Sequence, residues 1–329
     1  MTGGLRVVAF GGGTGLPVLL RGLRDTVGDG MTAVVTVADD GGSSGRLRQE
    51  LGVAPPGDVR SCLVALAGRR RLAEVFDYRF EGGVDLRDHS VGNIIIAALA
   101  DMSGGFVEGV EQAGHFLRVK GRVYPAAVES LTLMVSYTDG TVTRGESTVR
   151  GSARTVARIA VEPEYVPAPE GVIRAIGAAD VVVLSAGSLF TSTIPALLGG
   201  GVREALEGFA GPVFYVANVM TQPGETLGLS LADHIQAITD HVGPVVTHVL
   251  VDPRDLSRQI LDRYRAEGAA PVEVDYAAIE RLGVRVQEAI VLSEAADAEV
   301  RHDPDSLARA VHEVARRHRA ALVSRRASA

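Results

Sequence analysis

A run of glycines near the amino terminus is the first part of this sequence that could bind a ligand. Gly11-Gly12-Gly13-Thr14-Gly15 follows a β-branched run and precedes a helical pattern of leucines. Glycines after a strand let the backbone approach a ligand closely, and the start of the next helix favours a negative charge. The spacing matches neither the dinucleotide fingerprint nor a Walker loop. We therefore expect this turn to hold a nucleotide diphosphate.

Two adjacent carboxylates follow the second apolar run. Asp39 and Asp40 precede the polar loop Gly41-Gly42-Ser43-Ser44-Gly45-Arg46. An acidic residue at this position of a doubly wound fold commonly binds a ribose hydroxyl. The pair could instead hold Mg²⁺, or Asp39 could cap a turn. Arg46 could neutralise negative charge on the ligand, although exposed arginines are usually solvated.

Two loops later in the chain combine a helix start with polar side chains. Asp58 lies in Pro55-Pro56-Gly57-Asp58-Val59-Arg60, where it could cap the helix or help to form the site. His89 stands in Asp88-His89-Ser90-Val91-Gly92-Asn93, beside a hydroxyl and an amide. A lone histidine is more often structural, but these neighbours favour a binding role for the loop.

Polar loops also follow two further strand-like runs. Ser185 to Thr193 contains Gly187 and Ser188, and Asn218 opens a loop that ends at Thr226. Ligands bind beyond the carboxyl ends of parallel strands. All four strand-end loops are therefore expected to line one crevice.

The elements that must position these loops alternate between strands and helices. Apolar runs at Arg6 to Phe10, Thr32 to Ala38, Val181 to Leu184 and Val213 to Val216 have helical patterns between them. This alternation predicts a Rossmann-like, doubly wound α/β fold with a mainly parallel sheet. We expect a single domain over residues 1–329.

One region departs from the alternation. Val119 to Tyr124, Leu131 to Tyr137 and Thr141 to Gly145 alternate polar and apolar residues, and Asp139-Gly140 is a hairpin signal. We predict an antiparallel β insertion at about residues 119–150. Apolar positions at helical spacing predict a C-terminal helix at about residues 305–321.

Composition limits the classes of partner. The chain has 329 residues, 46% of them hydrophobic, and a net charge of −7, which offers no general attraction to nucleic acid or an anionic membrane. The single cysteine, Cys62, excludes an intrachain disulfide. We find no signal peptide and no apolar stretch long enough for membrane insertion, so we expect a cytoplasmic protein. The insertion and the terminal helix are candidate surfaces for a homodimer.

Taken together, the motifs resemble those of a known family. In chain order they are GGGTGL, TVADDGGSSGRLR, PPGDVR, DHSVGN, GSLFTS and NVMTQPGET. They are similar to the motifs of the YvcK-like gluconeogenesis factors in the CofD-like superfamily. The resemblance implies a CofD-like fold and binding of UDP-sugars such as UDP-N-acetylglucosamine. It also implies a regulatory, non-catalytic role in cell shape and wall synthesis during gluconeogenic growth.

The resemblance also implies which residues line the cleft. Those that fall on family motifs are Gly12, Gly13, Thr14, Asp39, Asp40, Ser43, Ser44, Asn93, Gly187, Ser188 and Asn218. Gly15, Arg46, Asp58 and His89 join them from the arguments above. A late motif adds Arg301 and His302, for which a surface loop is the structural alternative. One departure is Ser185-Ala186, where the family usually has Gly-Pro.

Two other functions remain open. The same superfamily contains the 2-phospho-L-lactate transferases of coenzyme F420 synthesis, which use a guanosine diphosphate donor. Their first turn is of a Gly-Val-Gly-Gly type, unlike Gly13-Thr14-Gly15 here. An NAD-dependent oxidoreductase would use the same sheet edge, but no convincing acid/base pair for hydride transfer accompanies it.

Overall fold

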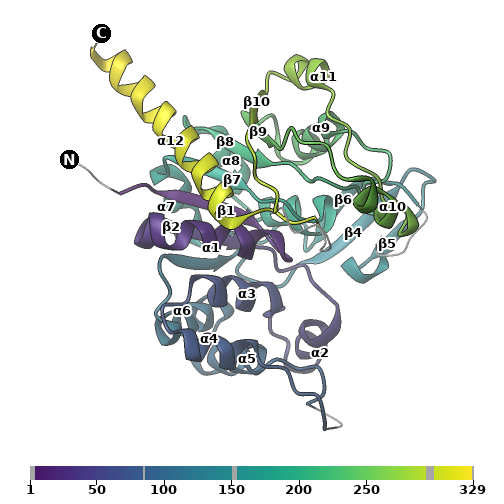
Figure 1. Ribbon diagram of the computed structural model, residues 1–329. Helices are drawn as coiled ribbons and strands as arrows, with labels where there is room; N and C mark the ends of the chain where they lie inside the picture. The colour runs from purple at the N-terminus through teal and green to yellow at the C-terminus, as the bar shows by residue number, and fades with distance from the viewer. Residues whose placement is uncertain (1–3, 84–85, 150–153, 294–299, 328–329) are drawn as a thin grey trace.

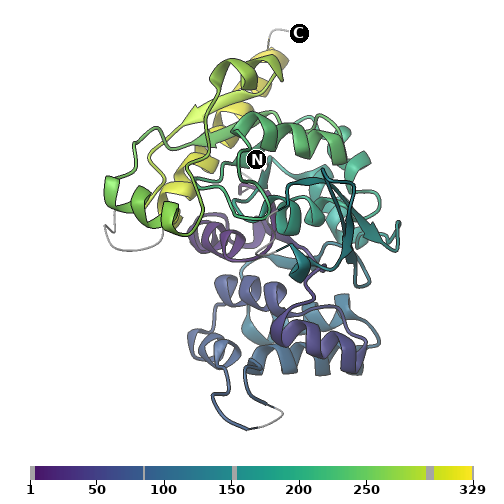
Figure 2. The ribbon, with the colours of Figure 1, turned by 90° about the vertical axis from the view of Figure 1, so that its right-hand side faces the viewer.

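A seven-stranded sheet forms the centre of the molecule (Figures 1 and 2). The computed structural model describes residues 4–83, 86–149, 154–293 and 300–327. Every pair of neighbouring strands in this sheet is parallel, and the spatial order is β10-β9-β8-β7-β1-β2-β3. The strands are β1 (Val7–Gly11), β2 (Met31–Val35), β3 (Arg122–Pro125), β7 (Val181–Leu184), β8 (Val213–Val216), β9 (His248–Val251) and β10 (Arg285–Glu288).

The central strands are apolar along their whole length because both faces of the sheet are covered. Every residue of β1, β2, β7 and β8 is buried. Parallel sheets need a crossover between successive strands, and the crossover helices pack on the faces. The doubly wound, mainly parallel architecture predicted from the sequence is confirmed.

Helices cover the sheet and form a lobe beside it. In both ribbon views α2 to α6 gather below the sheet, while α12 extends away at the carboxyl terminus (Figures 1 and 2). The α-helices are α1 (Gly15–Val27), α2 (Gly42–Leu51), α3 (Gly57–Leu66), α4 (Arg70–Asp77), α5 (Val91–Ser103), α6 (Phe106–Leu117), α7 (Glu170–Ala178), α8 (Val202–Glu207), α9 (Leu231–Val242), α10 (Arg258–Ala266), α11 (Tyr276–Arg281) and α12 (Pro304–Ala327). Short helical turns are η1 (Gly28–Gly30), η2 (Glu146–Thr148), η3 (Leu189–Thr193) and η4 (Pro195–Leu197).

The antiparallel insertion is present, with different bounds from those expected. Its three strands are β4 (Thr132–Tyr137), β5 (Val142–Arg144) and β6 (Val156–Glu162), in the order β5-β4-β6. The Asp139-Gly140 hairpin joins β4 to β5, with Gly140 at a φ of 84°. The expected strand Val119 to Tyr124 is instead β3, the edge of the parallel sheet, and the third antiparallel strand lies beyond residue 150.

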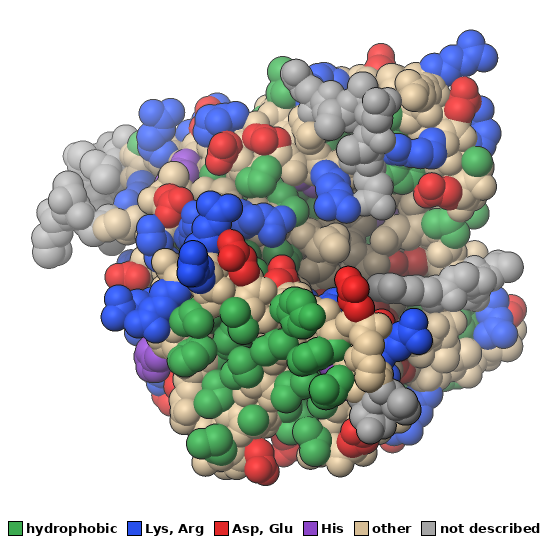
Figure 3. All heavy atoms as spheres, turned by 60° about the horizontal axis from the view of Figure 1, so that its bottom comes forward, with side chains coloured by type: hydrophobic (Ala, Val, Ile, Leu, Met, Phe, Trp, Pro, Cys, Tyr) green, Lys and Arg blue, Asp and Glu red, His purple; other side chains and the backbone are tan. Residues whose placement is uncertain are grey.

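The helical lobe carries an apolar outer surface. Figure 3 shows hydrophobic side chains gathered on the side where Figure 1 places α4, α5 and α6. Exposed members include Val75 on α4, Met102 on α5 and Phe116 on α6, with Met102 79% exposed. Within the described part of the chain, no helix has the length and apolar character needed to cross a membrane.

Candidate functional site

The site lies where the chain reverses direction across the sheet. From β1 the chain passes to β2 and β3 on one side, and it returns to β7 on the other side of β1. In open α/β sheets such a switch point is where a ligand-binding crevice is expected, at the carboxyl ends of the strands. A cavity of about 230 Å³ occupies this position. It is lined by Thr14, Gly15, Val18, Leu19, Ser185, Ala186, Gly187, Val216, Asn218, Val219, Met220, Thr221, Gln222, Tyr264, Val300, Arg301, His302 and Leu307.

Two glycine turns meet at the edge of this cavity. A Cβ added to Gly15 would lie 1.5 Å from the carbonyl oxygen of Ala186, so the start of α1 fits against the turn after β7 only without a side chain. Gly187 differs, because a Cβ there would meet nothing nearer than 3.7 Å. The protein itself therefore leaves space at Gly187, beside the cavity that this residue lines.

Asn218 fixes the second turn through both ends of its amide. Its Oδ1 accepts a hydrogen bond from the Gly187 N–H at 3.2 Å, and its Nδ2 donates to the Gly187 carbonyl at 2.7 Å. The loop after β8 thereby holds the backbone of the loop after β7. Asn218 also lines the cavity, so it both positions the turn and can contact a ligand.

Two side-chain polar atoms, in residues that line the cavity, are buried from solvent and have no hydrogen-bond partner among the described residues. They are the hydroxyl oxygen of Ser185 and Oε1 of Gln222. Leaving a buried polar group unpaired is costly, and such groups in native proteins usually find a partner. Neither atom exposes as much as 1 Å² of accessible surface, so a ligand would reach them only if the side chains turned toward the cavity.

Arg301 brings positive charge to the cavity. Among the described lining residues it alone carries a permanent charge, and no carboxylate is present. The segment around it is held by a short antiparallel contact: the Ser293 N–H donates to the Arg301 carbonyl at 2.8 Å, and the Asp303 N–H donates to the Val291 carbonyl at 2.7 Å. The cavity therefore suits an anionic ligand.

Asp252 anchors the strand that pairs with the Arg301 segment. Its Oδ2 accepts from the N–H groups of Val291 and Leu292 at 2.8 and 2.9 Å, and Arg254 donates to both carboxylate oxygens. Burial alone would raise the pKa of Asp252, but these hydrogen bonds lower it to about 2. The carboxylate is thus charged, and it fixes the backbone at Val291 and Leu292, next to which the Arg301 segment is bound.

A second group of predicted residues forms a polar cluster, comprising Ser43, Arg60, His89 and Asn93. Arg60 Nε donates to Asn93 Oδ1 at 3.1 Å, and Asn93 Nδ2 donates to the Ser43 hydroxyl at 3.1 Å. The Ser43 hydroxyl also forms a hydrogen bond with Nδ1 of His89 at 3.0 Å. Burial, followed by the charge of Arg46, lowers the pKa of His89. The lowered pKa favours the neutral imidazole at pH 7.

Four helix starts converge where the cluster meets the first glycine turn. Asp58 in the first turn of α3 accepts from the Gly13 N–H at 2.7 Å, and Ser44 in α2 accepts from the Gly57 N–H at 3.1 Å. Ser43 in α2 bonds Asn93 in α5, as described above. The starts of α1, α2, α3 and α5 are therefore adjacent, and their dipoles favour an anion there. The Gly13 N–H itself is already occupied by Asp58.

The remaining predicted side chains form hydrogen bonds within the protein. Asp39 Oδ1 accepts from the Gly41 N–H at 2.9 Å, which closes a turn. Asp40 accepts from the Ser147 N–H of the insertion at 2.9 Å, and Arg46 donates to the Arg87 carbonyl at 2.7 Å. Ligand contact by these three side chains stays a prediction.

Magnesium binding also stays a prediction. In the described ranges, no group of three or more histidine, cysteine, aspartate or glutamate residues is placed to hold a metal ion. Mg²⁺ commonly takes one or two carboxylates together with substrate phosphates. Asp39 is the candidate carboxylate for that arrangement.

The predicted residues thus fall in two adjacent places. Thr14, Gly15, Gly187, Asn218 and Arg301 line the cavity, as does His302. Ser43, Ser44, Asp58, His89 and Asn93 form or adjoin the polar cluster, with Gly12 and Gly13 between the two groups. Ser188 directly precedes η3, and its carbonyl accepts hydrogen bonds from the N–H groups of Ser192 and Thr193 in that turn.

The predicted site left out most of the cavity lining, including Ser185, Gln222 and Tyr264. Ser185 and Gln222 stand within loops that the sequence marks as polar strand ends, but only the structure shows that their buried atoms lack partners. Tyr264 comes from α10, and nothing in its local sequence indicates the site. Its hydroxyl accepts from the Val300 N–H at 3.0 Å, beside Arg301.

Comparison with known proteins agrees with the fold and the motifs. The family described as 2-phospho-L-lactate transferase CofD matches residues 7–292. A gluconeogenesis factor from Halalkalibacterium halodurans is 43% identical over 311 residues, covering 93% of this chain and 95% of the relative. The gluconeogenesis factor of Bacillus subtilis is 42% identical over 306 residues, covering 92% of this chain and 96% of the relative.

Solved structures show the same architecture. A crystal structure of a Bacillus halodurans protein has a TM-score of 0.91 at 41% identity and covers 94% of this chain and 100% of that chain. A second crystal structure from this organism, described as a member of the UPF0052 family, has a TM-score of 0.90 at 40% identity, covering 95% of this chain and 100% of its own. The chain therefore belongs to the CofD family and groups with its gluconeogenesis factors.

Proposed function

We propose that this protein is a cytoplasmic, non-catalytic factor that binds UDP-N-acetylglucosamine and is needed for cell shape and wall synthesis under gluconeogenic growth. The observation that carries the proposal is the cavity at the switch point, which is lined by the turn at Gly187, by the amide of Asn218 and by the positive charge of Arg301. The motifs that resemble UDP-sugar-binding relatives surround it, and the matched relatives are named gluconeogenesis factors.

The cavity is large enough for only one part of a nucleotide sugar, so the rest of the ligand would lie outside it. The cavity measures about 230 Å³, below the ~300 Å³ lower end for pockets that hold drug-sized ligands. It would take the uracil and ribose. The diphosphate would lie between the two glycine turns and Arg301, and the sugar would extend toward the polar cluster.

A transferase is the second candidate, because the matching family is described as 2-phospho-L-lactate transferase CofD. Incubation of the protein with Mg²⁺, a guanosine-diphosphate phospholactate donor and a deazaflavin alcohol as the acceptor of the phospholactyl group, followed by mass spectrometry, separates the two functions. We expect neither donor consumption nor breakdown of UDP-N-acetylglucosamine. Consumption of the donor would support the transferase, and an absorbance change with NAD and a candidate substrate would support an oxidoreductase.

The cellular role needs its own experiment. Cells that lack the protein should lose their normal shape on a gluconeogenic carbon source and keep it on glucose. Expression of the wild-type protein should restore the shape, whereas Asn218→Ala, produced at the same level, should not. Equal rescue by both proteins would contradict a role that depends on the ligand.

A further inference from the structure

A second cavity lies at the opposite edge of the sheet from the proposed UDP-sugar site. It measures about 360 Å³ and is lined by Pro212, His248, Arg285, Val286, Gln287, Val314, Arg317, His318 and Ala321. His248 and Arg285 are the first residues of β9 and β10, and Pro212 directly precedes β8. The cavity is therefore at the amino ends of the strands, whereas the first cavity is at their carboxyl ends.

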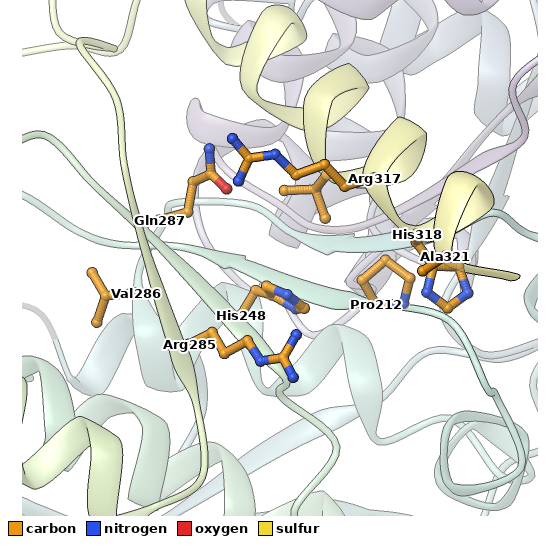
Figure 4. Close-up of a pocket in the computed structure, with 9 residues that line it drawn as sticks. Pro212, His248, Arg285, Val286, Gln287, Arg317, His318 and Ala321 are labelled. Atoms are coloured by element: carbon orange, nitrogen blue, oxygen red, sulfur yellow. The ribbon is translucent and has the colours of Figure 1, made fainter. Parts of the chain in front are cut away.

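The sheet and α12 direct basic side chains into this space. His248 and Arg285 are register partners in neighbouring parallel strands, so their side chains share a face. Arg317 and His318 follow Val314 at helical spacing and lie on one face of α12. Figure 4 shows both guanidinium groups and both imidazole rings around the same space.

The charge inside the cavity is not balanced by its lining. None of its described lining residues is acidic. Arg285 has no hydrogen bond or ion pair with any side chain in the described ranges, while Arg317 pairs with Glu313 on its own helix. Burial lowers the pKa of His248, and the charges of Arg285 and His318 lower it further. In a chain with a net charge of −7, this is a local concentration of positive potential.

We propose that this cavity binds a small phosphorylated metabolite, about the size of a sugar phosphate. The guanidinium of Arg285, that of Arg317, which also pairs with Glu313, two imidazoles and the amide of Gln287 place several donors around one space, which suits the three oxygens of a phosphoryl group. The volume lies within the range of about 300–1,000 Å³ for small-molecule sites. This site is distinct from the proposed UDP-sugar site and does not depend on it.

Calorimetric titration with inorganic pyrophosphate tests the proposal. All proteins carry Arg301→Gln, which removes the charged side chain of the first cavity. We expect one saturable site in this background, and a dissociation constant about tenfold higher or more when Arg285→Gln or Arg317→Gln is added, because each removes charge-assisted hydrogen bonds.

Arg316→Gln is the matched control, since it removes the same charge from an exposed position on α12 that does not line the cavity. It should leave the affinity for pyrophosphate unchanged, and thermal unfolding should show that all variants are folded. The proposal is overturned if the Arg301→Gln protein shows no saturable binding, or if all three further variants bind pyrophosphate equally.

Discussion

Gly187 lines the first cavity, yet the surrounding protein would accept a side chain there. A Cβ at this position meets the Gly12 carbonyl oxygen and the Thr193 hydroxyl no closer than 3.7 Å, which is ordinary contact. Its backbone φ is also outside the left-handed region. A glycine that the fold does not require, next to a cavity lined by Asn218 and Arg301, is best explained by close approach of a ligand.

Replacing Gly187 by alanine should therefore affect binding more than stability. We expect Gly187→Ala to weaken binding of UDP-N-acetylglucosamine about tenfold or more, because the methyl group occupies space that the diphosphate needs, and to change the free energy of unfolding by less than about 1 kcal/mol. Calorimetric titration and urea denaturation measure the two effects. Gly177→Ala on α7, where a Cβ meets nothing within 4 Å, is the control. Unchanged affinity in Gly187→Ala would argue against a ligand at this turn.

Buried histidines make stability depend on pH. Burial lowers the pKa of His234 and of His302 to about 4, against about 6.5 in an unfolded chain. A lowered folded-state pKa means that the stabilising contribution is complete above pH ~6.5 and is lost as the pH falls toward 4. The free energy of unfolding should therefore decrease over this range.

His234→Leu should reduce that decrease. Since His234 is fully buried on α9, we expect the loss of stability between pH 7 and pH 5 to be smaller in the variant by roughly 2 kcal/mol. Urea denaturation at both pH values measures it. His115→Leu, which replaces an exposed histidine, should keep the wild-type pH dependence. The same pH dependence in His234→Leu and the wild type would contradict the account.

At the scale of elements, the contact between α1 and the turn after β7 depends on one glycine. A Cβ on Gly15 would lie 1.5 Å from the carbonyl oxygen of Ala186 and 2.6 Å from its carbonyl carbon. Both are backbone atoms, so they cannot move aside as a flexible side chain could. We expect Gly15→Ala to lower the free energy of unfolding by roughly 2–4 kcal/mol, as measured by urea denaturation. A loss no larger than that of Gly177→Ala would show that the two elements are less tightly packed than described.

The strand segment around Leu292 connects Asp252 to Arg301. Asp252→Asn should weaken UDP-N-acetylglucosamine binding several-fold, because it loosens the support of Arg301. As a positioning residue, Asp252 should act only through that arginine. In an Arg301→Gln background, Asp252→Asn should therefore have no further effect on affinity. Independent, additive losses in calorimetric titrations would contradict this role.

The elements that local pattern specifies were predictable. Continuous apolar runs predicted the buried parallel strands, and Asp139-Gly140 predicted the hairpin of the insertion. The alternating run Val119 to Tyr124 suggested an antiparallel strand, but β3 pairs with β2 in parallel at the edge of the main sheet. Alternation reports one exposed side and does not identify the neighbouring strand. Tyr264 was unpredictable because α10 reaches the cavity only through the tertiary fold.

At the scale of the whole molecule, α12 connects the two edges of the sheet. Leu307 near its start lines the first cavity, and Arg317 and His318, just past its middle, line the second. Arg319 ties the helix to the sheet, donating to Asp180 Oδ1 and Oδ2 at 2.9 and 2.6 Å just before β7. The helix is therefore fixed at a point near the second cavity.

The homodimer expected from the sequence stays a prediction. The exposed apolar side chains on α4, α5 and α6 form a surface that was not among the expected interfaces, which were the insertion and α12 (Figure 3). Analytical ultracentrifugation would give the oligomeric state of the full chain.

The central claim is that the crevice beyond β1, β7 and β8 binds a UDP-sugar. Isothermal titration calorimetry of the wild-type protein with UDP-N-acetylglucosamine, beside Asn218→Ala, tests it most directly. Asn218 lines the cavity and holds Gly187 through both ends of its amide. We expect one saturable site per chain and affinity at least about tenfold weaker in the folded variant. No saturable heat from folded wild-type protein, or equal affinity in Asn218→Ala, would contradict the claim.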